Sequence, residues 1–172
     1  MPVPVLHTER LILRPLTPED TLGIYALRSN DVVNKYISRP KVNKLQDAAM
    51  FINRITDSYE KGNHSFWVIC LKDSLQLIGT ICLWNFSEDR KTAELGYELH
   101  PDFHGKGFMN EALKEVIAYA ASIDVLTIEA FTHRENTNSK NLLEKNAFIL
   151  HPDRTDDDNL NNIIYSLNIK TS

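Results

Sequence analysis

The chain has few of the features that mark secreted, disulfide-bonded and membrane-spanning proteins. Its 172 residues include two cysteines, Cys70 and Cys82, which lie in apolar runs and have no CxxC spacing. We expect two buried free thiols in a cytoplasmic protein rather than a disulfide or a cysteine metal site. No apolar run approaches the roughly 20 residues that cross a bilayer. The first residues lack the basic start and the apolar core of a signal peptide. These absences favour a cytoplasmic location without membrane association.

An excess of positive charge and a metal-ligand pattern are also missing. The chain has 19 Lys and Arg residues against 23 Asp and Glu, which gives a formal net charge of −4. Such a chain has no overall field that attracts nucleic acid, so we expect no direct nucleic-acid partner. The histidines at positions 7, 64, 133 and 151 stand apart without ligand spacing. No metal cofactor is therefore expected.

The order of hydrophobic periods predicts one α+β domain over residues 1–172, because no repeat or linker divides the chain. Strands are expected at 9–14, 65–71, 75–86, 92–99, 125–132, 147–150 and 163–169. Helices are expected at 17–29, 31–36, 43–61, 109–122 and 138–145. The acidic segment 153–158 is expected to be a solvated hairpin tip. This order is typical of a central, mostly antiparallel mixed sheet flanked by helices.

Glycine is scarce, six residues in all, yet two of the six stand in the stretch His104-Gly105-Lys106-Gly107-Phe108-Met109-Asn110. This loop joins the strand 92–99 to the helix 109–122. Free N–H groups and the helix dipole at such a junction favour a phosphate or pyrophosphate. The loop lacks the GxxxxGK[ST] pattern of P-loop enzymes, and its glycine pattern is too incomplete for a Rossmann enzyme.

Three sequence blocks together resemble the GNAT family of acyl-CoA-dependent N-acetyltransferases, and more narrowly its ribosomal-protein N-terminal acetyltransferase branch. They are Thr8–Pro15 (TERLILRP), Glu94–Leu99 (ELGYEL) followed by Gly105–Ala112, and Asn136–Phe148. The match has two departures. His104 and Met109 replace the usual ends of the pyrophosphate motif. Ala147 stands where the family usually has glycine, and alanine predicts a more ordinary backbone angle there.

The resemblance implies the GNAT fold and acetyl-CoA as co-substrate, with the pyrophosphate held by backbone N–H groups of the loop. The strand 92–99 would splay from the strand 125–132, so that the pantetheine arm pairs with a free strand edge. A backbone N–H near Leu99 or His100 would polarise the thioester carbonyl. The residues assigned to the cofactor are Leu99, His100, His104, Gly105, Lys106, Gly107, Phe108, Met109, Asn110, Asn136 and Ser139.

The implied reaction is direct attack of a neutral amine on the thioester in a ternary complex. Glu94 is our candidate general base, with Glu98 and Glu129 as alternatives. Many family members place a tyrosine beside the departing thiolate, at the position that Leu143 occupies here. Ser139 is therefore our candidate donor to the thiolate, and an ordinary role in the first turn of its helix is the alternative.

The resemblance places Tyr36, Trp84 and Phe86 beside the acceptor cleft, although burial in the core is an alternative for the last two. A protein N-terminal α-amine is the favoured acceptor, because it titrates near pH 7.7–8.0 and a lysine amine near 10.4. A small-molecule amine or polyamine acceptor is the alternative within the enzyme class. Outside that class, the alternative is a catalytically silent acyl-CoA-binding module. A homodimer is common in the family and stays an open alternative.

Overall fold

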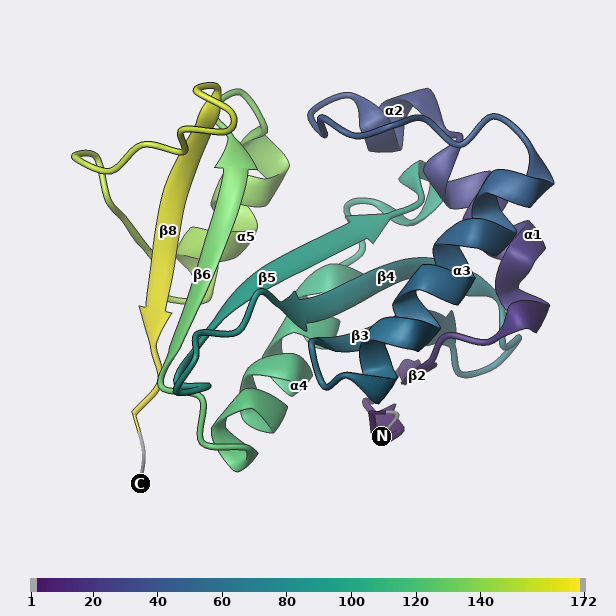
Figure 1. Ribbon diagram of the computed structural model, residues 1–172, viewed down its shortest axis with the longest axis horizontal. Helices are drawn as coiled ribbons and strands as arrows, with labels where there is room; N and C mark the ends of the chain where they lie inside the picture. Colours follow the sequence, from purple (N-terminus) through teal and green to yellow (C-terminus); the bar gives the residue numbers. More distant parts are fainter. Residues whose placement is uncertain (1–2, 171–172) are drawn as a thin grey trace.

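The computed structural model describes residues 3–170 (Figure 1), and the two residues at each end of the expected domain lie outside this range. Eight strands form one sheet in the order β1-β2-β3-β4-β5-β6-β8-β7. Every neighbouring pair is antiparallel except β5 and β6, which are parallel. The predicted mixed, mostly antiparallel sheet is confirmed. The strands are β1 (Leu6–His7), β2 (Leu11–Pro15), β3 (His64–Leu71), β4 (Leu77–Trp84), β5 (Thr92–Leu99), β6 (Thr127–His133), β7 (Ile149–Leu150) and β8 (Asn162–Asn168).

Helices cover both faces of this sheet (Figure 1). They are α1 (Thr21–Arg28), α2 (Asp31–Asn34), α3 (Leu45–Glu60), α4 (Phe108–Ser122) and α5 (Thr137–Lys145), with short 3-10 turns η1 (Pro18–Asp20) and η2 (Pro101–Phe103). Strand β3 is buried on both sides. Its Phe66, Val68 and Cys70 join the core under α1 and α3, and its Trp67 and Ile69 join the core under α4 and α5. Alternation along the strand thus divides one apolar run between two cores.

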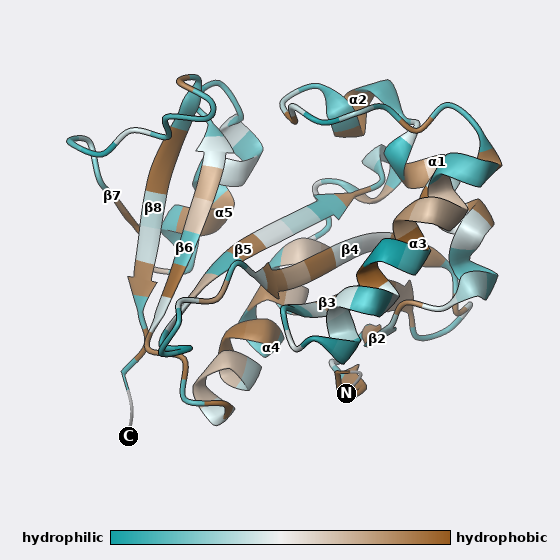
Figure 2. Cartoon of the chain, viewed as in Figure 1, coloured by the Kyte–Doolittle hydropathy of each residue, from teal (hydrophilic) through white to brown (hydrophobic). Residues whose placement is uncertain are grey.

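The apolar residues concentrate in the strands and in the helix faces that meet them, whereas most connecting loops are hydrophilic (Figure 2). Both cysteines are free, Cys70 buried and Cys82 half-buried. Within residues 3–170, none of the helices is both long enough and apolar enough to cross a membrane.

Most predicted elements are present, but several boundaries differ. The predicted strand 75–86 is wrong at both ends, because Leu75 (φ 62°) and Asn85 (φ 48°) adopt left-handed backbone angles outside β4. Phe86 therefore lies in the loop after β4. The predicted helix 17–29 is divided into η1 and α1. Strand β1 has no counterpart in the prediction.

The backbone at Ala147 also differs from the prediction. This residue follows α5 with a φ of 66°, the left-handed region that favours glycine. Its N–H donates to the carbonyl of Glu144 at 3.1 Å, and the N–H of Phe148 donates to the carbonyl of Leu143 at 3.0 Å. These bonds close the helix end. The expectation of an ordinary angle is wrong because closing the helix outweighs the preference of alanine.

Candidate active site

The site lies where two parallel strands separate. β5 and β6 pair only from Thr92↔Thr127 to Leu95↔Ala130. Beyond that point β5 stays paired with β4 up to Leu99, while β6 stays paired with β8. The two strands consequently diverge, as the teal and light green arrows show (Figure 1). The predicted splay is confirmed, and it leaves one edge of β5 without a partner strand.

The hydrogen bonds of β5 identify which backbone groups face the gap. The N–H of His100 donates to the carbonyl of Ile78 in the β4 direction, at 2.8 Å. Because bonding direction alternates along an antiparallel strand, Glu98 also points to β4, and Tyr97 and Leu99 point to the gap. The use of the His100 N–H as an oxyanion donor is therefore wrong. The N–H of Leu99 remains in position for that role.

The loop between η2 and α4 has the geometry of an anion cradle. Gly105 and Gly107 have φ angles of 73° and 78°, which glycine adopts without steric cost. Gly107 is the N-cap of α4, and no side chain caps this helix. The first intrahelical bond runs from the N–H of Glu111 to the carbonyl of Gly107, at 3.1 Å. The N–H groups of the first turn, at residues 108–110, are therefore free for a bound oxyanion.

A contact through Arg10, which the sequence does not predict, holds this loop from the turn between β1 and β2. Arg10 donates from Nη1 to the carbonyl of Lys106 (3.0 Å) and from Nε to Oε1 of Glu111 (3.1 Å). Its guanidinium carbon lies 4.2 Å from the centroid of the Phe108 ring. Thr8 donates to the other carboxylate oxygen of Glu111 at 2.6 Å. Burial raises the pKa of Glu111, but the hydrogen bonds from Thr8 and Arg10 hold it below its usual value.

The other end of the loop is joined to α5. The side chain of Asn146 donates to the side-chain oxygen of Asn110 at 2.8 Å. Met109 belongs to the apolar core, so only its backbone is available to a ligand. The ring of His104 lies 2.9 Å from the carbonyl of Leu99 and so ties the loop to the end of β5.

A pair of hydroxyl groups faces the gap from opposite elements. Asn136, which the resemblance assigns to the cofactor, also caps α5 by accepting from the N–H of Ser139 at 3.2 Å. Ser139 is buried, and its Oγ makes a short hydrogen bond with the phenolic oxygen of Tyr97 from β5. Burial raises the pKa of Tyr97 to about 12, so this phenol stays protonated at neutral pH. Leu143 is fully buried. A tyrosine hydroxyl from the sheet, that of Tyr97, thus lies beside the first turn of α5.

The three candidate carboxylates have different partners. Glu98 is buried and lies 3.2 Å from Nη1 of Arg28 and 2.6 Å from Nη2 of Arg39. Glu129 lies 2.6 Å from Nη1 of Arg154, which belongs to the acidic segment 153–158. That segment is mostly exposed, but through Arg154 it is more than a solvated tip.

Glu94 is the carboxylate of the three that forms no ion pair with a residue of the described chain. It accepts a hydrogen bond from Nδ2 of Asn85 at 3.2 Å. Burial raises its pKa, the Asn85 bond lowers it, and the nearby charges of Asp156 and Glu129 raise it, with a net shift upward. A carboxylate with this environment accepts a proton more readily than one fixed between cations.

Gly96 lies between Glu94 and Glu98 on the same side of β5 by alternation. A Cβ atom at Gly96 would lie 3.0 Å from Sγ of Cys82 and 3.8 Å from Nε1 of Trp84, so side chains of β4 already occupy this space. Glycine therefore lets Cys82 and Trp84 pack against β5 between the two carboxylates.

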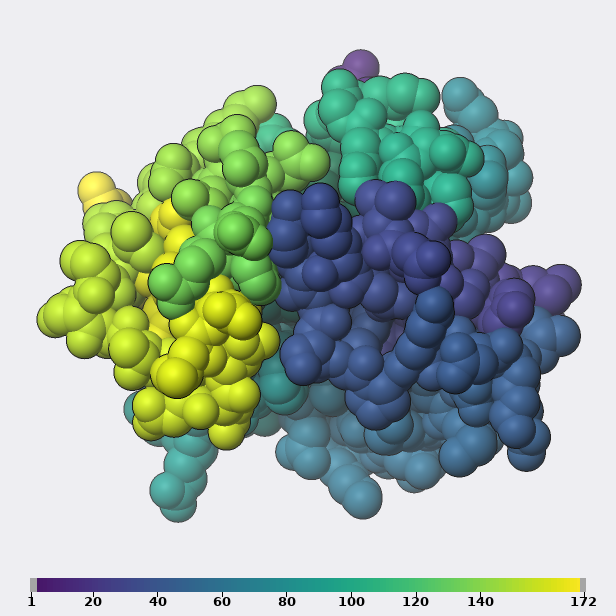
Figure 3. All heavy atoms as spheres, turned by 90° about the horizontal axis from the view of Figure 1, so that it is seen from above, coloured from purple at the N-terminus to yellow at the C-terminus, as the bar shows by residue number. Residues whose placement is uncertain are grey.

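The structure places the three predicted acceptor residues at separate positions. Trp84 ends β4 opposite Glu94 in the sheet register, is 38% exposed, and stacks on His64 with ring centroids 6.0 Å apart. Tyr36 follows α2, and its ring centroid lies 5.1 Å from that of His133 at the end of β6. Viewed from above, the blue segment with α2 meets the green segment beyond β6 (Figure 3).

Phe86 does not share a face of the sheet with Trp84. It packs against the core on the α4 side, and the guanidinium of Arg90 lies 4.2 Å from its ring centroid. The left-handed turn at Asn85 is the physical reason, because it ends the alternation of β4 before Phe86. Among the residues at positions 3–170, no group of three or more His, Cys, Asp or Glu side chains is placed to hold a metal ion.

Proteins of known structure share this fold. RimL, described as a ribosomal L7/L12 alpha-N-protein acetyltransferase in complex with coenzyme A, has a TM-score of 0.86 at 16% identity, covering 98% of this chain and 100% of that one. The ribosomal-protein-S5-alanine acetyltransferase from Vibrio fischeri has a TM-score of 0.81 at 16% identity, covering 96% and 97%. At these identities the similarity establishes the fold.

Sequence comparison establishes the family. The uncharacterized N-acetyltransferase YoaA of Bacillus subtilis (strain 168) is 33% identical over 146 residues, which are 84% of this chain and 82% of that protein. The uncharacterized N-acetyltransferase p20 of Bacillus licheniformis is 33% identical over 83% of this chain and 81% of its own. A family described as the acetyltransferase (GNAT) domain matches residues 10–149. With its splayed strands and the glycine loop that opens α4, the chain belongs to the GNAT family of N-acetyltransferases.

Proposed function

We propose that this enzyme moves the acetyl group of acetyl-CoA to a protein N-terminal α-amine by direct attack in a ternary complex. The observation that carries the proposal is the pair of opposite surfaces at the splay. An open anion cradle lies beside the free edge of β5. Glu94, which forms no ion pair within the described chain, lies beside Gly96 on the face of β5 opposite Tyr97.

On the cofactor side, the fit of acetyl-CoA rests on the backbone. The loop supplies N–H groups at residues 105–110 for the pyrophosphate, and Lys106 adds a positive charge. The free edge of β5 at Tyr97 and Leu99 has the spacing of backbone donors and acceptors that an amide-containing arm pairs with. Bound there, acetyl-CoA supplies the activated acetyl group, and the N–H of Leu99 stabilises the negative charge on its carbonyl oxygen.

On the acceptor side, Glu94 is the proposed general base. The neutral amine forms the new C–N bond at the thioester carbonyl, and its surplus proton passes to Glu94 through water. The C–S bond then breaks. Ser139 donates a hydrogen bond to the sulfur as negative charge develops, and Tyr97 orients the Ser139 hydroxyl.

An α-amine suits this site better than a lysine amine. With a pKa near 7.7–8.0, an α-amine is partly neutral at physiological pH, and a base with a modestly raised pKa is sufficient. Solved structures of similar fold include RimL and the S5-alanine enzyme, whose descriptions name protein α-amines and ribosomal proteins. These descriptions support the choice of acceptor class.

The test is coenzyme A release from acetyl-CoA with a panel of N-terminal peptides, N-acetylated copies of those peptides as controls, and small primary amines. We expect release with free N-termini, and none with the blocked copies. Release with small amines alone would show that the acceptor is a small amine and not a protein N-terminus. Calorimetric binding of acetyl-CoA without release on any acceptor would instead favour the catalytically silent module.

A further inference from the structure

A buried charge cluster beside the reaction gap has one positive charge too many. Glu98 is 5% exposed, and the two arginines that flank it, Arg28 and Arg39, are 13% and 16% exposed. One carboxylate neutralises one guanidinium. A second guanidinium of this low exposure is costly unless an anion joins it.

The two arginines retain unused donors. A guanidinium has five N–H groups. Arg28 uses one of them, to Glu98, and its Nε is buried with no hydrogen-bond partner in the described chain. Arg39 donates from both Nε and Nη2 to the side-chain oxygen of Asn34, and its Nη2 also forms the ion pair with Glu98. Both N–H groups of its Nη1 have no partner within the described chain.

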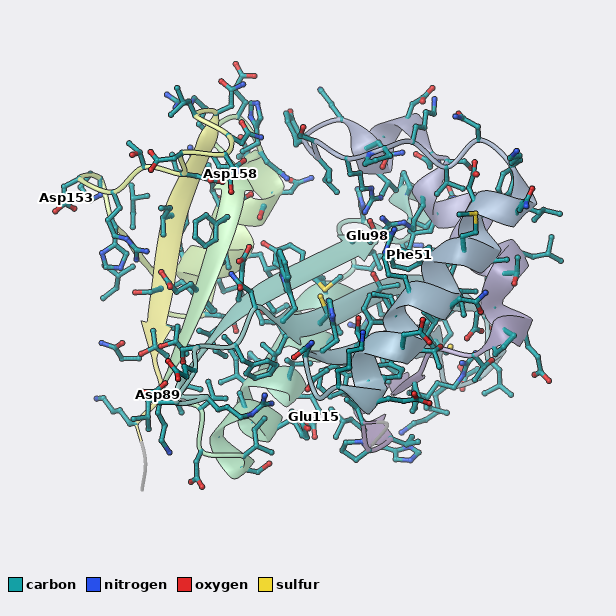
Figure 4. All side chains as sticks on the ribbon, in the orientation of Figure 1. Phe51, Asp89, Glu98, Glu115, Asp153 and Asp158 are labelled. Atoms are coloured by element: carbon teal, nitrogen blue, oxygen red, sulfur yellow. The ribbon has the colours of Figure 1, made fainter. Side chains whose placement is uncertain are left out.

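The surroundings of Arg28 add positive rather than negative charge. Its guanidinium carbon lies 3.8 Å from the centroid of the Phe51 ring, which Arg54 approaches from 5.4 Å. Burial lowers the pKa of Arg28, Glu98 raises it, and the charges of Arg39 and Arg54 lower it again. Figure 4 labels Glu98 and Phe51 close together on the α2 side of the sheet.

The cluster lies on the face of β5 where the acceptor would bind. Glu98 neighbours Tyr97 in β5, so their side chains point to opposite faces. Tyr97 meets Ser139 of α5 on the face with the phosphate loop. Glu98 lies with Glu94 and Gly96 on the other face, where α1 supplies Arg28 and the loop after α2 supplies Arg39. The phosphates of a cofactor on the loop therefore do not reach these arginines.

We propose that Arg28 and Arg39 form a subsite for a carboxylate of the acceptor, so that the enzyme favours peptides with an acidic residue at position one or two. This inference rests on the proposed function, since it names the preferred sequence of the N-terminal acceptor. The distance along the acceptor follows from Leu99. Its N–H faces the reacting carbonyl and belongs to the residue next to Glu98, so the carboxylate must lie within about two residues of the amine.

The alternative is a purely structural cluster that fastens α1 and the loop after α2 to β5. Both roles predict a loss of stability when an arginine is removed. Only the subsite predicts a change in preference between an acidic peptide and its uncharged isostere. That ratio is therefore the quantity to measure.

The experiment compares kcat/KM for peptide pairs that differ by Asp or Asn at position one, and for pairs that differ at position two. For the unmodified enzyme we expect the acidic peptide to be favoured roughly ten-fold in at least one pair, mainly through a lower KM. Arg39→Gln should abolish the ratio. Arg54→Gln is the matched control: it removes the same charge from a residue that does not contact Glu98, and should leave the ratio within about two-fold.

Glu98→Gln should raise the ratio, because it leaves both guanidinium groups without their carboxylate. If this variant does not fold, Arg39→Lys tests the same point: it keeps the charge but loses the planar fork, and should give an intermediate ratio. Equal rates for acid and amide in the unmodified enzyme would overturn the subsite. The subsite would also be overturned if the ratio fell equally in the Arg39 and Arg54 variants, because that result indicates attraction by the overall positive charge of this face.

Failure of the proposed function gives a different result. In that case no peptide is acetylated and only small amines react. Alanine and alaninamide, compared per neutral amine, then report on the carboxylate subsite independently of the peptide acceptor. Preference for alanine that Arg39→Gln removes would retain the subsite and reject the peptide; no preference would reject both.

Discussion

Replacing Arg10 with alanine tests whether the turn between β1 and β2 holds the phosphate loop in its binding shape. The hydrogen bond from Arg10 to the Lys106 carbonyl contributes about 0.5–1.5 kcal/mol. The ion pair with Glu111 contributes about 0.2–1 kcal/mol and the contact with the Phe108 ring about 0.5–1 kcal/mol. Because the Arg10 side chain is 42% exposed, solvent screening places the sum near the low end, at about 1.5 kcal/mol.

If this free energy acts wholly on loop shape, the Kd for CoA rises about ten-fold in Arg10→Ala. Isothermal titration calorimetry with CoA measures the change, and a thermal melt checks that the variant is folded. Arg10→Lys separates shape from charge, because lysine keeps the charge but has no fork to join Lys106 and Glu111. A Kd for Arg10→Lys near that of the alanine variant supports the brace. An unchanged Kd in Arg10→Ala would refute it, and Arg54→Ala, on α3 across the sheet, serves as the matched control.

Three further changes test the chemistry and the backbone. Glu94→Gln should lower kcat/KM about 10²–10⁴-fold. In the unmodified enzyme the rate per neutral amine should rise with pH as Glu94 loses its proton, at a pH above the usual carboxyl range because burial raises the pKa of Glu94. The pH–rate profile of the variant should lack this rise. Ser139→Ala should reduce turnover several-fold with little change in the Kd for acetyl-CoA, and equal turnover would remove Ser139 from the mechanism. Ala147→Gly should raise the Tm by about 2–4 °C, because it releases about 1 kcal/mol of left-handed strain, and a lower Tm in differential scanning calorimetry would contradict this.

The sequence predicts what depends on neighbours along the chain. β5 has the expected limits, Asn136 caps α5, and both loop glycines have positive φ angles. Each of these follows from a local rule: side-chain alternation, a cap three residues before its partner, or a turn that needs glycine. Ala147 is the local failure, since the bonds that close α5 impose an angle that alanine does not prefer.

The sequence does not predict contacts between distant segments. Arg10 and Glu111 are 101 positions apart, and Tyr97 and Ser139 are 42 apart. The periodicity of apolar residues does not indicate which strand or turn lies next to the start of a given helix in the folded protein. The sequence therefore predicts the loop and its glycine angles, but neither its brace by Arg10 nor the tyrosine beside Ser139. The turn at Asn85, which removes Phe86 from the acceptor face, is equally invisible to alternation.

The three glutamates show why the acceptor is harder to predict than the donor. Glu94 and Glu98 lie on one strand, and Glu129 lies directly beside Glu94 in the parallel register. Their different chemistry comes from arginines far away in the chain: Arg28 is 70 positions from Glu98. Those arginines pair with Glu98 and Glu129, and Glu94 forms no ion pair within the described chain, which favours it as the proposed base. They also leave a surplus positive charge at Glu98. In the proposed mechanism the ion pairs that leave Glu94 as the base also determine the charge that the acceptor meets, so that catalysis and specificity on this face are coupled through one strand.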